Sequence, residues 1–140
     1  MKILAAVDGS PCSKRLLAWL AAHEEWRGPG TELTILTVVP PPPPRAAALL
    51  DKVLLREWRD EEIDKVFKPV RALLAKQGIE ARCVGKPGDP TEVIAKQATD
   101  GGYDLVVMGS HGHGQLAQLL MGSVTSAVMA RCRTPVLVVR

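Results

Sequence analysis

Short apolar runs, separated by segments of helical length, constrain this chain more than any other feature of its sequence. The runs are rich in Val, Leu and Ile, as is typical of strands that are buried on both faces. The segments between them have helical spacing, so strands and helices alternate along the chain. That alternation predicts an α/β fold with a parallel sheet and right-handed crossovers. We predict strands over residues 3–7, 33–39, 105–108 and 136–139, and a weaker one over residues 80–84.

Two helix N-termini are marked by a capping residue that is followed by proline. Ser10-Pro11 predicts a helix that runs to about residue 26, and Asp89-Pro90 predicts another. The first side chain of each pair can accept a hydrogen bond from the first turn, and proline suits the first helical position.

An unbroken proline run, residues 40–44, follows the second predicted strand. It cannot form a helix interior or a central strand, because proline has no backbone N–H to donate. We expect an extended, polyproline-like exit from the strand, and then a long helix over residues 46–77 that Pro69 kinks or splits. The run is interpreted as a stiff loop, and the alternative is a ligand for a partner protein.

The composition, with 46% apolar and 24% charged residues, favours one ordinary globular domain over residues 1–140. The net charge is only +3 and the chain has no run of lysines and arginines, so we expect no nucleic-acid partner. No acidic residue follows Asp104, which makes the last quarter of the chain favourable for an anion.

Three widely spaced cysteines argue against disulfides and against a cysteine-rich zinc site. The chain shows no signal peptide and no apolar run of membrane-spanning length, so we expect a cytoplasmic protein that does not enter a membrane.

A glycine-spaced loop near the C-terminus is the strongest functional signal. Gly109 and Gly112 follow a predicted strand, and Gly122-Ser123 precede a helical segment over residues 124–131. Glycine lets backbone N–H groups approach a ligand, and a helix N-terminus adds donors and partial positive charge. The stretch therefore predicts a phosphate site to which Ser123 contributes a hydroxyl.

Two common nucleotide motifs do not explain this loop. Gly85-Lys86 is followed by Pro87 and not by the Ser or Thr that a Walker A loop needs. Residues 112–117 match the dinucleotide pattern G-x-G-x-x-G/A, but no acidic residue follows them to bind a ribose. That pattern also belongs after the first strand and not after the fourth, so we treat the match as coincidence.

The loop resembles that of the universal stress protein family. ATP-binding members of that family carry Gly, two residues, Gly, nine residues and then Gly-Ser or Gly-Thr, which is the spacing of Gly109, Gly112 and Gly122-Ser123. The resemblance extends along the chain, through residues 2–10, 88–94, 103–112 and 134–139.

The resemblance implies a three-layer, Rossmann-like α/β fold whose five-stranded parallel sheet has the order 3-2-1-4-5. Strands 1 and 4 would then diverge at a switch point, where open α/β sheets bind ligands. It also implies that ATP is bound, accompanied by Mg²⁺ or Mn²⁺, and that a homodimer forms through the C-terminal strand, residues 135–140. The implied ATP-binding residues are Ala6, Val7 and Asp8 near the adenosine, Val38 on adenine, Met108, Gly109 and Gly112 along the ribose and phosphates, and Gly122, Ser123 and Val124 on the phosphates.

Some of these residues also have plainer explanations. Asp8 could cap the first helix or stabilise its turn, although its place at a strand end favours ligand contact. His111 and His113 are interpreted as solvated loop residues near the phosphates, because no carboxylate or thiol nearby completes a metal site. Cys12 is interpreted as a small buried residue and not as a reactive thiol.

Three functions stay open at this point. The preferred one is an ATP-binding regulatory or stress-response protein, because the loop offers phosphate donors and no general base follows it. The alternatives are a slow, metal-assisted ATPase that uses Asp8 and a nucleotide-free dimeric interaction module. No catalytic residue is assigned.

Overall fold

The strands form one parallel sheet in the order β3-β2-β1-β4-β5, which confirms the expected order. The computed structural model describes residues 1–112 and 121–140. β3 begins two residues later than predicted, because its register with β2 pairs Thr34 with Arg82 and Val39 with Pro87. The strands are β1 (Lys2–Ala6), β2 (Glu32–Val39), β3 (Arg82–Pro87), β4 (Leu105–Gly109) and β5 (Val136–Val139).

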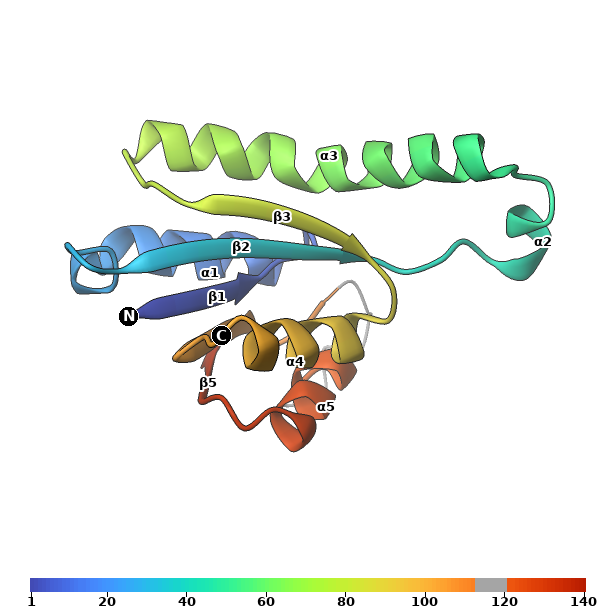
Figure 1. The fold of residues 1–140 in the computed structure, drawn as a ribbon. Helices are drawn as coiled ribbons and strands as arrows, with labels where there is room; N and C mark the ends of the chain where they lie inside the picture. Colours follow the sequence, from blue (N-terminus) through green and yellow to red (C-terminus); the bar gives the residue numbers. More distant parts are fainter. Residues whose placement is uncertain (113–120) are drawn as a thin grey trace.

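Helices cover both faces of the sheet and complete three layers (Figure 1). On one face α1 (Pro11–Ala22) and α3 (Lys52–Lys76) pack, and on the other α4 (Pro90–Asp100) and α5 (Ser123–Arg131). Successive strand residues point to opposite faces, so each strand contributes to two separate cores. Ile3 lies in the core beneath α1 and α3, whereas its neighbour Leu4 lies in the core beneath α4 and α5.

Side chains cap the N-termini of three helices, as the sequence predicts for two of them. The Ser10 side chain accepts a hydrogen bond from the Ser13 amide at the start of α1. Asp89 accepts one from the Glu92 amide at the start of α4, and Asp51 caps α3 in the same way. The N-cap residue of α5 is Gly122, and within residues 1–112 and 121–140 no side chain caps this helix.

The helix predicted over residues 46–77 is in fact two helices, α2 (Pro44–Ala47) and α3. The break comes before Lys52, because Asp51 has an extended backbone and its carboxylate accepts the amides that open α3. Pro69 does not split the helix. Pro69 is exposed, and burial of Phe67 and Val70 beside it holds this part of α3 on the sheet.

The predicted first helix is also shorter than expected. α1 ends at Ala22, and a separate 3₁₀ turn, η1 (Glu24–Trp26), follows it. His23 leaves helical torsion angles, and its Nδ1 lies 2.8 Å from the Trp19 carbonyl oxygen.

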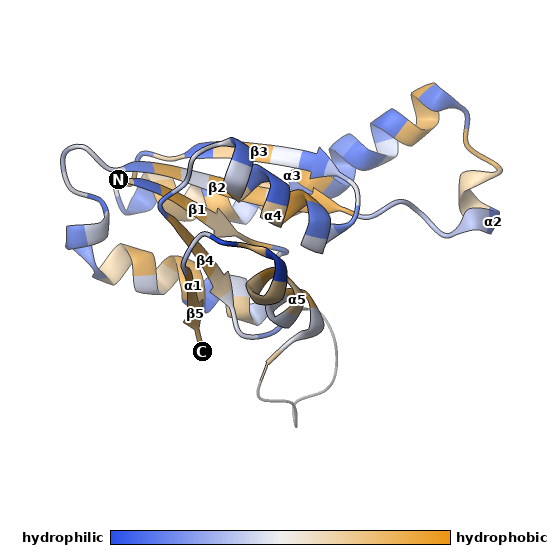
Figure 2. Ribbon diagram, turned by 60° about the horizontal axis from the view of Figure 1, so that its bottom comes forward, coloured by the Kyte–Doolittle hydropathy of each residue, from blue (hydrophilic) through white to orange (hydrophobic). Residues whose placement is uncertain are grey.

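The segment between β2 and the middle of α3 projects beyond the end of the sheet (Figure 2). Residues 40–43 have no regular secondary structure, as expected of a proline run, and α2 follows directly. In the described part of the chain, no helix is both long enough and apolar enough to cross a bilayer.

Candidate functional site

A cavity of about 290 Å³ lies at the carboxyl ends of β1 and β4. From β1 the chain passes through α1 to β2 on one side of the sheet, and from β4 it goes on to β5 on the other. This is the switch point at which open α/β sheets leave a crevice. The cavity is lined by all of the predicted ATP-binding residues, namely Ala6, Val7, Asp8, Val38, Met108, Gly109, Gly112, Gly122, Ser123 and Val124.

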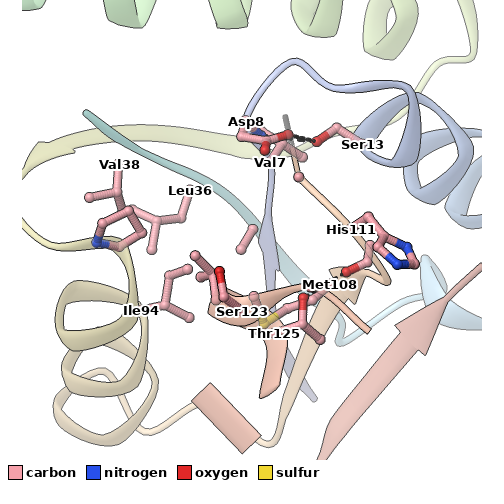
Figure 3. A pocket seen from close by; sticks show the side chains of 16 residues that line it. Val7, Asp8, Ser13, Leu36, Val38, Ile94, Met108, His111, Ser123 and Thr125 are labelled. Carbon is pink, nitrogen blue, oxygen red and sulfur yellow. Dashed lines mark hydrogen bonds between the residues drawn. The ribbon is translucent and has the colours of Figure 1, made fainter. Parts of the chain in front are cut away.

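Asp8 is held on the cavity wall by the turn that leads into α1 (Figure 3). Its Oδ1 accepts hydrogen bonds from the Ser10 amide at 2.9 Å and from the Ser13 hydroxyl at 2.8 Å. The Ser13 hydroxyl in turn accepts the Asp8 amide at 2.9 Å. The plainer explanation for Asp8, a turn stabiliser, is therefore correct for one carboxylate oxygen, while the residue also faces the cavity.

Gly112 lies directly against the Asp8 carboxylate. A Cβ at Gly112 would lie 2.7 Å from Asp8 Oδ2, closer than real Cβ atoms approach a neighbour. The loop after β4 and the turn after β1, distant in sequence, are thus in direct contact. A side chain at position 112 would push the carboxylate from its place.

Gly109 has a different reason to be glycine. A Cβ there would lie 2.8 Å from the Cβ of Cys12 and 3.2 Å from the Cys12 carbonyl carbon, so the absence of a side chain lets α1 pack against the end of β4. Cys12 is 5% exposed, in agreement with its interpretation as a small buried residue.

Gly122 closes the loop at its other end. Its amide donates to the Ser110 carbonyl oxygen at 2.6 Å, and a Cβ would meet the His111 Cα and the same oxygen at 3.2 Å. The Thr125 hydroxyl donates to the Gly109 carbonyl oxygen at 2.9 Å and ties α5 to β4. The N-terminus of α5, with Ser123 and Val124 in its first turn, is thereby held at the cavity, where its dipole favours negative charge.

Part of the cavity lining is apolar. Leu36, Val38 and Ile94 lie together at one end in Figure 3, and all three belong to the core beneath α4 and α5. Ala6 and Pro90 also line the cavity. The site therefore combines an apolar slot with a glycine- and hydroxyl-lined helix N-terminus, which is a suitable environment for a flat ring that carries an anionic group.

The cavity has further lining residues that the sequence reasoning did not assign to the site. Two of them had a readable signal: Leu36 shares a strand face with Val38, and Ile94 lies one turn after Pro90 on α4. The signal for Ser13 is weaker: it is a second serine, one helical turn after the Ser10 cap. The full set is Ser13, Leu36, Pro90, Ile94, His111 and Thr125.

His111 is half-buried and lines the cavity, so it is less solvated than predicted. Its Nδ1 lies 3.0 Å from the hydroxyl of the buried Ser110, which orients the ring. His113 and most of the dinucleotide-like pattern at 112–117 lie outside the described residues.

An open, parallel α/β sheet with a ligand-sized cavity at its switch point is an arrangement that many nucleotide-binding domains share. The universal stress protein family model matches residues 1–140, and the chain belongs to this family. Universal stress protein YxiE of Bacillus subtilis is 30% identical over 99% of this chain and 98% of its own length. A universal stress protein of Thermus aquaticus is 33% identical over 99% of this chain and 97% of its own length.

Solved structures agree with this assignment. The structure of protein MJ0577, whose curated counterpart is a universal stress protein of Methanocaldococcus jannaschii, superposes with a TM-score of 0.79 and 27% identity, over 99% of this chain and 94% of that one. A universal stress protein in complex with cAMP has a TM-score of 0.72 and 22% identity, over 100% of this chain and 97% of that one. A universal stress protein from Archaeoglobus fulgidus in complex with dAMP has a TM-score of 0.66 and 22% identity, over 100% of this chain and 98% of that one. The last two share the fold with this chain.

Proposed function

We propose that this protein is an ATP-binding regulatory or stress-response protein that holds ATP in the cavity between β1 and β4. The observation that carries the proposal is the cavity itself, which brings an apolar slot and the N-terminus of α5 together at the switch point. Adenine nucleotides bound to two proteins of the same fold support the choice of base.

The lining suggests one orientation for the nucleotide. We place adenine in the slot formed by Leu36, Val38 and Ile94, where burial of a planar ring is favourable. Asp8 lies where its carboxylate can accept hydrogen bonds from hydroxyl or amine groups of the adenosine. The phosphates then reach the first turn of α5, where Ser123 adds a hydroxyl to the backbone donors.

The lining is better suited to hold ATP than to cleave it. Among the described residues that line the cavity, Asp8 is the one carboxylate, and its Oδ1 already accepts two hydrogen bonds. Among the same residues, the other side chain that could act as a general base is His111, whose Nδ1 is already engaged with the Ser110 hydroxyl. This observation places the slow ATPase second to the binding function.

The described residues do not build a metal cage at this site. Over residues 1–112 and 121–140, no group of three or more His, Cys, Asp or Glu side chains could hold an ion. If Mg²⁺ or Mn²⁺ accompanies ATP, its ligands would be the phosphates and water. Mg²⁺ commonly keeps several waters when it travels with nucleotide phosphates.

Two further parts of the proposal concern assembly and location. β5 is an edge strand, and a short apolar edge needs protection from unwanted pairing. We propose that residues 135–140 pair with their counterparts in a homodimer. Cys12, Cys83 and Cys132 are all free thiols, which is compatible with a cytoplasmic location.

Native mass spectrometry of the purified protein and of Gly122→Val tests the proposal. We expect the mass of ATP on the first and not on the second, because a side chain at Gly122 would meet the backbone of Ser110 and His111. Gly28→Val is the matched control, since nothing lies within 4 Å of a Cβ at that position. Absence of ATP from the wild-type protein, together with no ATP binding by titration, would reject the function.

A further inference from the structure

The proline run between β2 and α2 has a conformation that its covalent structure sets in advance. Each residue from Pro40 to Pro43 is itself followed by proline. The ring fixes φ, and the following ring excludes helical ψ, so these residues must be extended. Pro43 has φ −51° and ψ 145°, close to ideal polyproline II, and the run ends at Pro44, which begins α2.

The burial of the run follows the period of a polyproline helix. With about three residues per turn, residues three apart share a ridge. Val39 and Pro42 share one ridge, and the first is buried while the second is half-buried. The other two ridges carry Pro40 with Pro43 and Pro41 with Pro44, and all four of these rings are exposed. One ridge therefore faces the protein and two face solvent.

In the stretch of chain that contains the run, the charge has a single sign. Between Glu32 and Asp51, the one charged side chain is that of Arg45, which is exposed directly after the last proline. The run also lies on the segment that projects from the body of the molecule (Figure 2). A partner could therefore approach two proline ridges and a guanidinium without meeting the sheet.

We propose that Pro40–Arg45 is a docking segment for a protein domain whose groove is lined by aromatic side chains and bordered by acidic ones. Pairs of prolines three apart fill such grooves, and a preformed polyproline helix loses little conformational entropy when it binds. The proposal is independent of the nucleotide site.

Other partners fit the segment less well. A strand-adding partner needs backbone N–H groups, and residues 40–44 have none. A second copy of this chain would have to supply the aromatic groove. Its Phe67 is buried, its three tryptophans are half-buried, and the hydroxyl of Tyr103 is bonded to Thr34.

The test is a titration of the full chain against a panel of isolated aromatic-groove domains, an SH3, a WW and an EVH1 domain, followed by NMR. A free peptide of residues 38–47 is the reference. We expect at least one domain to bind both the chain and the peptide, and Pro41→Ala/Pro43→Ala to weaken binding by about tenfold or more. Pro42→Ala is the matched control, because it changes the same chemistry on the inward ridge, and it should change binding less than threefold. Arg45→Glu should weaken binding, and Arg45→Lys should weaken it less.

Each alternative outcome overturns the proposal. If no domain binds the chain, or if domains bind the peptide and not the chain, the ridges are not a docking surface. If Pro42→Ala is as damaging as the double variant, the face has been wrongly assigned. Circular dichroism melts of every variant verify that a loss of binding does not come from unfolding.

Discussion

The N-termini of α1 and α5 both follow a strand of the same sheet, and both lie beside the cavity, yet they are built differently. At α1 the protein supplies its own ligands: the Ser10 side chain caps the helix, and Asp8 and Ser13 bond to the turn before it. At α5 the N-cap is Gly122, and no side chain of the described residues caps the helix. The first amides of any helix need hydrogen-bond acceptors, and at α1 the protein's own side chains supply them.

This difference indicates a division of labour. A self-capped terminus contributes to folding stability, because its amides are bonded whether or not a ligand is present. A terminus without a side-chain cap at a cavity keeps its dipole and its donors directed at whatever enters. We therefore expect loss of the Ser10 cap of α1 to act mainly on stability, and substitutions at the N-terminus of α5 to act mainly on nucleotide binding. Ser13, which bonds to Asp8 on the cavity wall, should affect both.

The largest effect is expected from Ser123→Asp. A carboxylate in the first turn of α5 would repel the phosphates, and we expect ATP affinity to fall by about a hundredfold, or roughly 2.7 kcal/mol. Without nucleotide the same charge is favourable at a helix N-terminus and should raise the free energy of unfolding by about 0.3–1 kcal/mol. Calorimetric titration and urea unfolding measure the two quantities, with Ser123→Asn as the uncharged control. Equal losses in both variants would show that the charge is not responsible.

A smaller, mixed effect is expected from Ser13→Ala. The hydroxyl bridges the amide and the carboxylate of Asp8, so its loss should lower ATP affinity about tenfold and cost about 1 kcal/mol of stability. If Ser13 acts through Asp8, adding Asp8→Asn to Ser13→Ala should give less than the sum of the two binding losses. Ser126→Ala, at an exposed serine of α5, is the control. Additive losses would mean that Ser13 and Asp8 act independently.

The smallest effect on binding is expected from Ser10→Ala. Loss of the α1 cap should lower the free energy of unfolding by about 1 kcal/mol. ATP affinity should change less than about twofold, because alanine keeps the backbone amide that Asp8 accepts. Urea unfolding and titration of the same preparation test this. A large loss of affinity at unchanged stability would contradict the division of labour.

The sequence alone predicts much of this fold, because the strands are buried on both faces and their apolar runs are hard to mistake. The caps at Ser10 and Asp89 are also predictable from the sequence, because a capping residue followed by proline is a local signal. The strand order, in contrast, came from the family resemblance. Local patterns do not say which strands lie side by side.

Other features depended on contacts that local patterns cannot reveal. Pro69 signals a helix break, yet burial of its neighbours against the sheet overrides that signal, while the cap at Asp51 moves the break upstream. Gly109 was predicted as a phosphate glycine, but its close neighbour within the protein is Cys12, nearly a hundred positions earlier in the chain. The contact between Gly112 and Asp8 likewise appears only when the turns after β1 and β4 meet.

The threefold period of the proline run has a consequence for the way the chain tolerates deletions. Each residue of a polyproline helix advances the chain by about 3.1 Å and turns it by about a third of a revolution. Removal of one proline from Pro40–Pro44 should therefore redirect α2 relative to the end of β2, whereas removal of three should shorten the connection and keep its direction. The number of prolines thus determines the direction in which α2 leaves the end of β2.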